Sequence, residues 1–164
     1  MKVVLTQNAT KFITADALRY NLHIDVYQDV FTNDLEDQQV AHIMLAKWAD
    51  CILVAPSSAA LIHRIANSSC EDLASLVITA AQATVPVIIA PNMNVNMWKN
   101  PLVQKNIGIC QENGYWVIQP GHASEANESW DTRSPELGGI GFFIGNVAEV
   151  LSQIYSQHHK IQNT

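Results

Sequence analysis

Short runs of apolar residues alternate along the chain with segments that have helical periodicity. Continuous apolar runs, which predict strands buried on both faces, occupy 2–6 (KVVLT), 51–58 (CILVAPSS), 86–91 (PVIIAP) and 115–120 (YWVIQP). Helical spacing of apolar residues occurs in 9–20, 38–50, 59–69, 71–82, 100–114 and 146–157. The polar stretch 25–39 and the Gly-, Ser- and Asn-rich stretch 121–143 show neither pattern and are predicted to be loops.

Buried strands that alternate with helices are typical of a parallel sheet covered on both faces. We therefore expect an α/β fold, a Rossmann-like or flavodoxin-like three-layer sandwich. Sheets of this kind bind ligands at the carboxyl ends of their strands, where proline-rich or polar turns follow most of the predicted strands. Residues 1–157 are predicted to form one domain with a substrate-side loop at 119–143, and 158–164 a polar tail.

Composition narrows the classes of partner. The chain has 164 residues, 48% of them hydrophobic, and a net charge of −6, which favours a folded protein over a disordered one and excludes a basic surface for nucleic acid. Its apolar runs are too short to span a membrane. Three cysteines without CxxC spacing favour reduced thiols in the cytoplasm over a disulfide framework or a metal site. All seven glycines lie at position 108 or later, so no glycine-rich nucleotide motif is present.

Two strand ends contain residues suited to ligand binding. In APSSAA (55–60), Ser57 and Ser58 place hydroxyls at a predicted helix N-terminus, where they could hold a phosphate or a ribityl-like chain or could simply cap the helix. In APNMNVNMW (90–98), the amides of Asn92 and Asn94 could bind a ring edge that carries carbonyl and N–H groups. The alternative for this second segment is a polar turn whose methionines and tryptophan fill the core.

The methionines of the second segment, Met93 and Met97, could lie against an aromatic face. His42 lies on the predicted helix 38–50 with Leu45 on the same apolar face. A histidine in such a place is either a core residue or a catalytic one. Asp72 is most simply explained as a helix N-cap.

In combination these segments resemble the homo-oligomeric flavin-containing cysteine decarboxylases, a flavoprotein family. The resemblance covers residues 1 to about 120 and depends on AHIMLAKWADCILVAPSSAALIHRIANSSCEDLAS followed by PVIIAPNMNVNMWKNP. The second stretch contains the family motif P-x-M-N-x-x-M-W, here Pro91, Met93, Asn94, Met97 and Trp98. Family members include phosphopantothenoylcysteine decarboxylases, epidermin-type peptidyl-cysteine decarboxylases and Hal3-type regulators.

The resemblance implies that FMN lies between the subunits of a homotrimer, which can assemble further into a homododecamer. It implies oxidation of a cysteine side chain to a thioaldehyde, loss of carbon dioxide and formation of an ene-thiol. His42 matches the active-site histidine, and Asn94 the residue that holds the substrate carboxylate, with Met97 beside it. Cofactor contacts are expected from Ser57, Ser58, Asp72, Asn92 and Met93. The partner would be a cysteine-containing peptide or small molecule.

Three departures from the family pattern bear on function. Family members open with an earlier strand and a Gly/Ser-rich turn for the FMN phosphate, which implies that the central strand and the phosphate site are absent from this sequence. Ala60 stands where the family has an asparagine. The coenzyme A branch has an Ala-Cys-Gly loop that helps to reduce the ene-thiol, but residues 119–143 contain no cysteine.

The missing cysteine and the PNMN sequence favour oxidative decarboxylation of the C-terminal cysteine of a peptide, with the ene-thiol as product. Two alternatives remain. One is a phosphopantothenoylcysteine decarboxylase that uses another reductant. The other is a non-catalytic Hal3-like flavin-binding regulatory protein, which Ala60 and the absent strand would favour.

Overall fold

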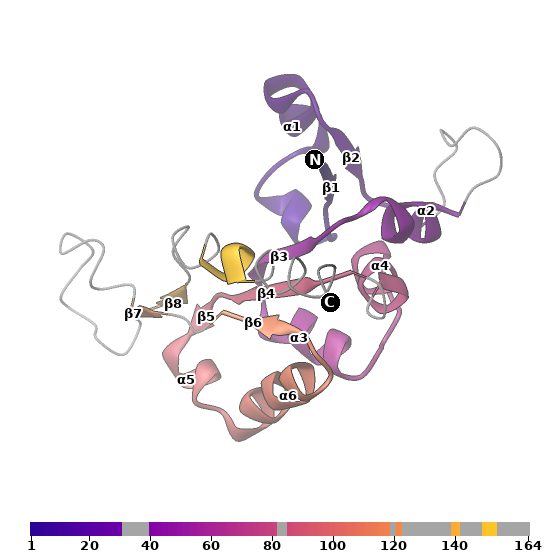
Figure 1. Cartoon of the computed structure of the whole chain (residues 1–164). Helices are drawn as coiled ribbons and strands as arrows, with labels where there is room; N and C mark the ends of the chain where they lie inside the picture. Colours follow the sequence, from indigo (N-terminus) through magenta and orange to yellow (C-terminus); the bar gives the residue numbers. More distant parts are fainter. Residues whose placement is uncertain (31–39, 82–84, 119–120, 123–138, 142–148, 154–164) are drawn as a thin grey trace.

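The computed structural model of the protein describes residues 1–30, 40–81, 85–118, 121–122, 139–141 and 149–153 (Figure 1). The strands are β1 (Lys2–Val4), β2 (Asp25–Tyr27), β3 (Ile52–Ser57), β4 (Val87–Pro91), β5 (Met93–Asn94), β6 (Trp116–Val117), β7 (Gly121–His122) and β8 (Gly139–Gly141). The helices are η1 (Ala9–Lys11), α1 (Ala15–Leu22), α2 (Ala41–Trp48), α3 (Ala59–Ala66), α4 (Leu73–Ala81), α5 (Val95–Trp98) and α6 (Pro101–Glu112). The α/β class predicted from the sequence is confirmed.

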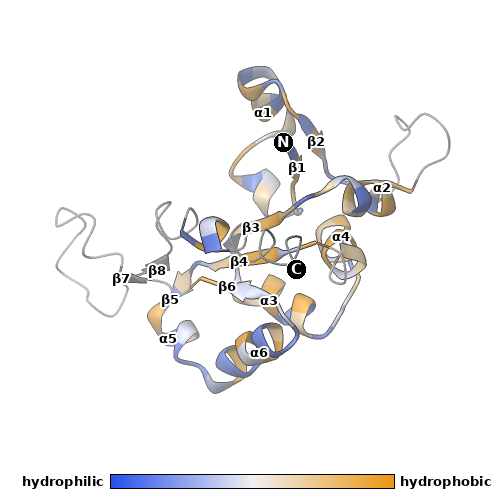
Figure 2. Cartoon of the chain, viewed as in Figure 1, coloured by the Kyte–Doolittle hydropathy of each residue, from blue (hydrophilic) through white to orange (hydrophobic). Residues whose placement is uncertain are grey.

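The central sheet is parallel and has the strand order β3–β4–β6. Alternate residues of β4 enter different layers, because successive side chains of a strand point to opposite faces. Val87 and Ile89 belong to the cluster that contains residues of α3 and α6, whereas Ile88 and Ala90 pack on the other face with Val150 of the helical segment 149–153. This gives the predicted layers of helix, sheet and helix, and Figure 2 shows the hydrophobic colouring along β3 and β4.

The N-terminal strands form a separate parallel pair, β1–β2, which projects from the rest of the molecule (Figure 1). The prediction of a loop throughout 25–39 was therefore wrong at Asp25–Tyr27. Val26 is buried opposite Val3, and Asp25 forms an ion pair of 3.0 Å with Lys2. A strand of three residues with one buried side chain is too short to give a periodic signal.

Two further segments differ from the predictions. The predicted helix 9–20 is divided into η1 and α1, because the Thr14 hydroxyl accepts a hydrogen bond from Ala17 N and caps a new helix. The predicted loop 121–143 contains β7 and β8, which pair antiparallel to each other, and β8 also pairs antiparallel with β5. The end of α6 is as predicted, since Gly114 adopts a φ of 85° just after it. Residues 154–164, which include the predicted tail, lie outside the described part, so the predicted domain limits remain predictions.

Candidate functional site at the carboxyl ends of β3 and β4

The two ligand-suited segments lie next to each other at the carboxyl ends of β3 and β4. Ser57 is in register with Pro91, and the backbone N–H of Asn92 donates to the Ser57 carbonyl at 3.0 Å. The parallel register between the two strands becomes irregular between Val54 and Ser57, so the APSS segment leaves the regular ladder just before α3 begins. The sheet topology thus joins two stretches that are more than thirty residues apart in the sequence.

The two serines have different environments. Ser58 is the N-cap of α3, and its hydroxyl accepts a hydrogen bond of 3.3 Å from Leu61 N. Ser58 therefore caps the helix, and its contact with a cofactor stays a prediction. Ser57 is fully buried, and its Oγ has no hydrogen-bond partner among the described residues. Because an unpaired buried hydroxyl costs free energy, Ser57 is the serine that still needs a partner from outside the described residues.

The Asn94 side chain is held by its amide oxygen, and its amide N–H₂ group donates no hydrogen bond among the described residues. Its Oδ1 accepts a hydrogen bond of 2.8 Å from Asn96 N and caps the single turn α5. This bond fixes the orientation of the amide, and its N–H₂ group can serve as a neutral hydrogen-bond donor. Met97 follows one turn later, and 48% of its surface is exposed. Asn92 is also exposed, whereas its backbone N–H is tied to β3.

Met93 behaves as a core residue. It is 7% exposed and packs in the same cluster as Val54, Ile62 and Ile89, and Trp98 packs against that cluster too. The core-filling alternative is therefore right for these two positions of the motif. The backbone of Met93 and Asn94 pairs with Ile140 and Gly139 of β8, which the sequence patterns did not foresee. The signal available was the Gly-Ile-Gly run of β8, because glycines in strands often mark a close backbone approach.

His42 and Asp72 come from other elements. His42 lies in the first turn of α2, partly buried, and its Nδ1 is a buried atom without a hydrogen-bond partner in the described part of the chain. The Asp72 carboxylate is fully engaged. It accepts hydrogen bonds from Ser75 N and Oγ and forms an ion pair of 2.6 Å with Arg64. The Asp72 contacts are those of a helix cap with a counter-ion, and Arg64 was not foreseen from the sequence.

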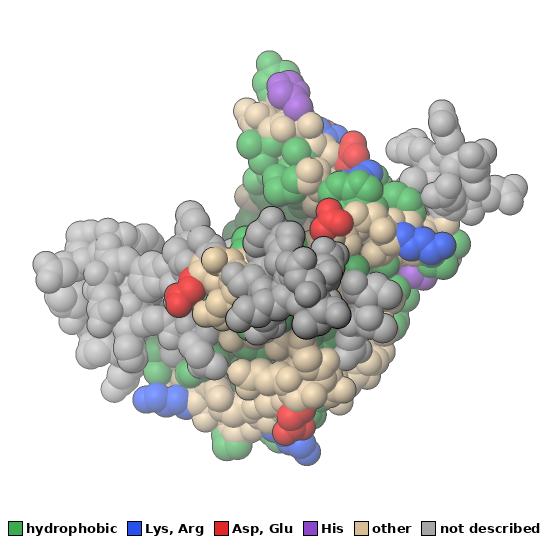
Figure 3. All heavy atoms as spheres, in the orientation of Figure 1, with side chains coloured by type: hydrophobic (Ala, Val, Ile, Leu, Met, Phe, Trp, Pro, Cys, Tyr) green, Lys and Arg blue, Asp and Glu red, His purple; other side chains and the backbone are tan. Residues whose placement is uncertain are grey.

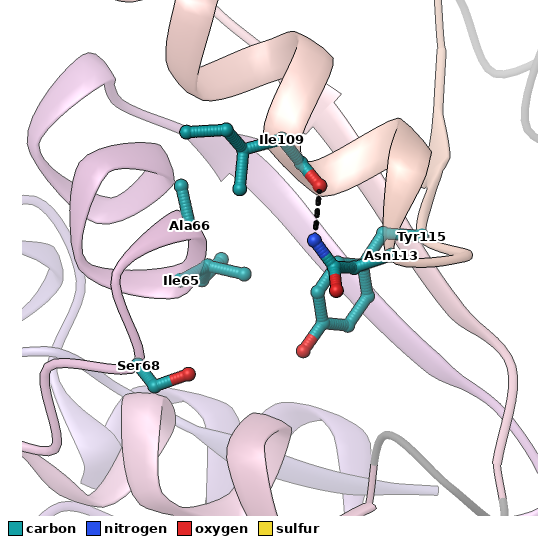
Figure 4. A pocket seen from close by; sticks show the side chains of 6 residues that line it. All are labelled: Ile65, Ala66, Ser68, Ile109, Asn113 and Tyr115. Carbon is teal, nitrogen blue, oxygen red and sulfur yellow. Dashed lines mark hydrogen bonds between the residues drawn. The ribbon is translucent and has the colours of Figure 1, made fainter.

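A small pocket lies between the C-terminal ends of α3 and α6. Its volume is about 60 Å³, and it is lined by Ile65, Ala66, Ser68, Ile109, Asn113 and Tyr115 (Figure 4). The Asn113 amide donates to the Ile109 carbonyl at 2.8 Å beside this pocket. A space of this size holds a water molecule but not a flavin or a peptide. The strand-end region is therefore the better candidate for a ligand site.

The three cysteines differ in burial. Cys70 is exposed, Cys51 is partly buried at the start of β3, and Cys110 is fully buried in α6. Burial raises the pKa of Cys51, and it raises the pKa of Cys110 to about 11. Because the thiolate is the reactive form, Cys110 is not a reactive thiol at neutral pH. Within the described residues no group of three or more His, Cys, Asp or Glu side chains could hold a metal, and no helix is long and apolar enough to cross a membrane.

The fold and the strand-end site define a Rossmann-like α/β protein with its binding edge at the carboxyl ends of parallel strands. The family model described as Flavoprotein matches residues 1–138, and the chain belongs to this flavoprotein family.

Individual relatives agree with this assignment. The probable phosphopantothenoylcysteine decarboxylase of Streptococcus mutans is 33% identical over 151 residues, which cover 92% of this chain and 83% of the relative. The bifunctional coenzyme A biosynthesis protein CoaBC of Bacillus subtilis is 38% identical over 73% of this chain, but the match spans only 29% of that protein. The crystal structure of the FMN-dependent cysteine decarboxylase SpaF superimposes with a TM-score of 0.73 at 25% identity, over 93% of this chain and 78% of SpaF.

Proposed function

We propose that the protein binds FMN and oxidatively decarboxylates the C-terminal cysteine of a peptide to an ene-thiol. The chain belongs to the flavoprotein family, and its relatives include phosphopantothenoylcysteine decarboxylases and FMN-dependent cysteine decarboxylases. The observation that carries the proposal is a pair of buried polar atoms, His42 Nδ1 and Ser57 Oγ, which lack hydrogen-bond partners in the described part of the chain. Buried polar atoms of native proteins have partners, so we infer that a bound molecule supplies the partner of each atom.

The strand-end residues fit a flavin chemically. The isoalloxazine ring presents carbonyl and N–H groups on its edge, and amide and hydroxyl side chains can pair with both kinds of group. Ser57 Oγ and the exposed Asn92 amide supply such groups at adjacent strand ends, and Ser58 sits at the first turn of α3. FMN, when bound, supplies the two-electron oxidation of the cysteine side chain. Asp72 would act indirectly, since its ion pair with Arg64 joins α3 to the start of α4.

The protein's own side chains would hold the substrate. The free amide N–H₂ of Asn94 would donate to the substrate carboxylate, since its Oδ1 is already used in the cap. The exposed Met97 would pack against the apolar part of the substrate. His42 Nδ1 is the nitrogen available to hold the thiol proton. With the carboxylate and the thiol both fixed, loss of carbon dioxide leaves the carbon–carbon double bond of the ene-thiol.

The number and position of the cysteines favour a peptide as the substrate. The coenzyme A branch of the family reduces the ene-thiol with the help of a cysteine near the substrate. Residues 119–143 contain no cysteine. Cys110 cannot take that role, because it is fully buried and its pKa is raised to about 11. The reaction would therefore end at the ene-thiol.

The test combines a spectrum with a mass measurement. Purified protein incubated with FMN and separated from free flavin should show a flavin absorption spectrum. A peptide that ends in cysteine should lose about 46 Da, which corresponds to carbon dioxide and two hydrogens removed in a cofactor-dependent oxidation. In the Asn94→Asp variant the cap acceptor is kept and the donor becomes an anion, so turnover should fall at least about a hundred-fold while the fold stays intact.

Matched histidine variants complete the experiment. His42→Asn should abolish turnover, whereas His63→Asn, on the exposed side of α3, should leave it unchanged. Normal turnover in both the His42 and Asn94 variants would contradict the proposal. Loss of mass from phosphopantothenoylcysteine but from no peptide would support the coenzyme A alternative. A protein that binds FMN but removes carbon dioxide from neither substrate would support the non-catalytic flavin-binding alternative, which Ala60, exposed in the first turn of α3, favours. A protein that stays colourless with excess FMN would contradict the proposed FMN binding.

We further infer that a second copy of the chain covers the outer face of α2. This helix is apolar nearly all round, although one face is already buried by Ala41, Leu45 and Ala46. Its outer residues Val40, Ile43, Met44 and Lys47 line an open hollow of about 490 Å³. A neighbouring subunit there would lie next to His42. Light scattering should give a trimer or a multiple of three, and Ile43→Lys should dissociate it; a monomer at micromolar concentration would contradict this inference.

A further inference from the structure

The segment that contains the candidate site is the basic part of an acidic chain. The net charge is −6, yet no carboxylate side chain occurs between Asp72 and Glu112, and the only charged residues in that interval are Lys99 and Lys105. Both lysines are exposed, and neither forms a salt bridge within the described residues. Glu112 lies seven residues beyond Lys105, about two helical turns away. Figure 3 shows basic side chains at the outer margin of the molecule over α5 and α6.

Exposed apolar side chains accompany these two lysines. Met97 is 48% exposed and Leu102 is 71% exposed, although both belong to helices that pack on the core through Trp98 and Ile107. Leu102 and Lys105 are three residues apart on α6 and are neighbours on its surface. We call the surface formed by Met97, Lys99, Leu102 and Lys105 the α5–α6 surface.

The α5–α6 surface is held in a fixed position relative to Asn94. Asn94 caps α5, and Asn100 caps α6 by accepting a hydrogen bond of 2.9 Å from Leu102 N. The backbone N–H of Asn100 donates to the Met97 carbonyl, and the Gln104 amide donates to the Trp98 carbonyl at 2.6 Å. Because these bonds join α5 to the start of α6, the backbone positions of the two lysines are fixed relative to the proposed carboxylate-binding amide.

We propose that the α5–α6 surface binds acidic residues that precede the C-terminal cysteine of the peptide substrate. This inference rests on the proposed function and names the class of peptide. A peptide whose carboxylate is held by Asn94 can run outward over Met97 toward Lys99. One turn of helix rises about 5 Å and an extended residue spans about 3.3 Å, so an acidic residue about two to four positions before the cysteine reaches Lys99. An apolar side chain of the peptide then covers Leu102.

The separation of the two cations favours an extended chain over a compact phosphate. Lys99 ends α5, whereas Lys105 lies in the second turn of α6. A phosphate group is bound best where several donors converge on one point, and the two lysines belong to different turns with Leu102 between them. Separate carboxylates on an extended peptide match this spacing, and their attraction to an exposed cation is screened by salt.

The experiment compares two peptides that end in the same cysteine, one with Asp and one with Asn two to four positions upstream. In the double variant Lys99→Gln/Lys105→Gln the KM for the acidic peptide should rise about five- to twenty-fold with unchanged kcat, since each screened charge contact is worth a small factor. The KM for the neutral peptide should not change. Lys11→Gln, which removes an exposed charge from η1, is the matched control and should alter neither peptide.

The outcomes separate this inference from the proposed function. An equal KM change for both peptides, or none for either, would overturn the peptide site while leaving the decarboxylase function intact. A KM increase confined to phosphopantothenoylcysteine would overturn it in favour of a phosphate. If no peptide loses carbon dioxide, the proposed function fails. In that case the anisotropy of a dye-labelled acidic peptide still tests the surface, which requires weaker binding by the double variant than by Lys11→Gln.

Discussion

β3 and β4 are neighbouring strands with similar apolar sequences but very different surroundings. All five residues of β4 are buried, whereas β3 exposes Leu53 to 47% and also exposes Ala55 and Pro56. β4 pairs with β3 on one side and with β6 on the other. β3 pairs only with β4 within the described residues, so it is an edge strand there although its sequence is as apolar as that of a buried strand.

This difference shows that an apolar run predicts a strand but not its neighbours. Edge strands of native proteins are normally blunted by charges, bulges or a covering segment, because their free N–H and C=O groups can pair with other strands. β3 has no charged residue, and its irregularity comes only after Val54. β1 also pairs on one side only, and no described strand lies between β1 and β3. Leu53 is in register with Ile88 of β4, so its exposed side chain reports what covers that face of the sheet beside the edge.

The largest expected effect contrasts Ile88→Ala with Leu53→Ala. Ile88 is fully buried at the centre of β4, and its truncation should lower the free energy of unfolding by about 3–4 kcal/mol through lost burial and a cavity. Leu53 is half exposed, so its truncation should cost less than about 1 kcal/mol. Urea unfolding followed by tryptophan fluorescence measures both.

The same pair of variants tests whether the face of β3 that carries Leu53 is uncovered in solution. Equal destabilisation by the two substitutions would mean that another chain covers Leu53 in solution. Repeating the unfolding at several protein concentrations would then identify a second copy, since a covering subunit makes stability depend on concentration. Independence from concentration together with a small Leu53 effect agrees with the structure.

The longer strands and helices around the central sheet could be predicted, because their patterns of apolar residues are long. The runs at 51–58 and 86–91 and the helix at 100–114 each contain enough apolar residues at one period to determine type and approximate limits. β2 could not be predicted, since three residues with a single buried valine contain no period. The β5–β8–β7 sheet could not be predicted either, because its strands have only two or three residues and pair across a long interval.

The sequence predicted which residues lie at the candidate site better than it predicted the contacts that these residues make. Asn94 and Ser57 could be placed at adjacent strand ends because parallel strands end at one edge of a sheet. The partners of Asp72 depend on how α3 meets α4, which no local pattern encodes, and Arg64 was therefore missed. Met93 could be assigned either to the core or to a ligand, and only its packing with Val54 and Ile89 distinguishes the two.

The smallest expected effect contrasts two adjacent serines at the end of β3. Ser58→Ala removes the hydroxyl that accepts from Leu61 N and should cost about 1 kcal/mol of stability. Ser57→Ala removes a buried hydroxyl that has no partner among the described residues, so stability of the flavin-free protein should be unchanged or slightly higher. FMN affinity should respond in the opposite order, because a bound molecule would supply the missing partner of Ser57.

Urea unfolding of the flavin-free Ser57→Ala and Ser58→Ala variants measures which substitution costs more stability. FMN titration of the same two variants measures which one lowers FMN affinity more. If Ser57→Ala destabilised the flavin-free protein as much as Ser58→Ala, the Ser57 hydroxyl would already have a partner within the chain. The end of β3 would then stabilise the fold, as buried β4 does, and would not bind the cofactor. The cofactor site would have to be sought around His42 instead. If Ser57→Ala weakens only FMN binding, the end of the exposed strand β3 binds the ligand. The buried strand β4 beside it would then contribute mainly to stability.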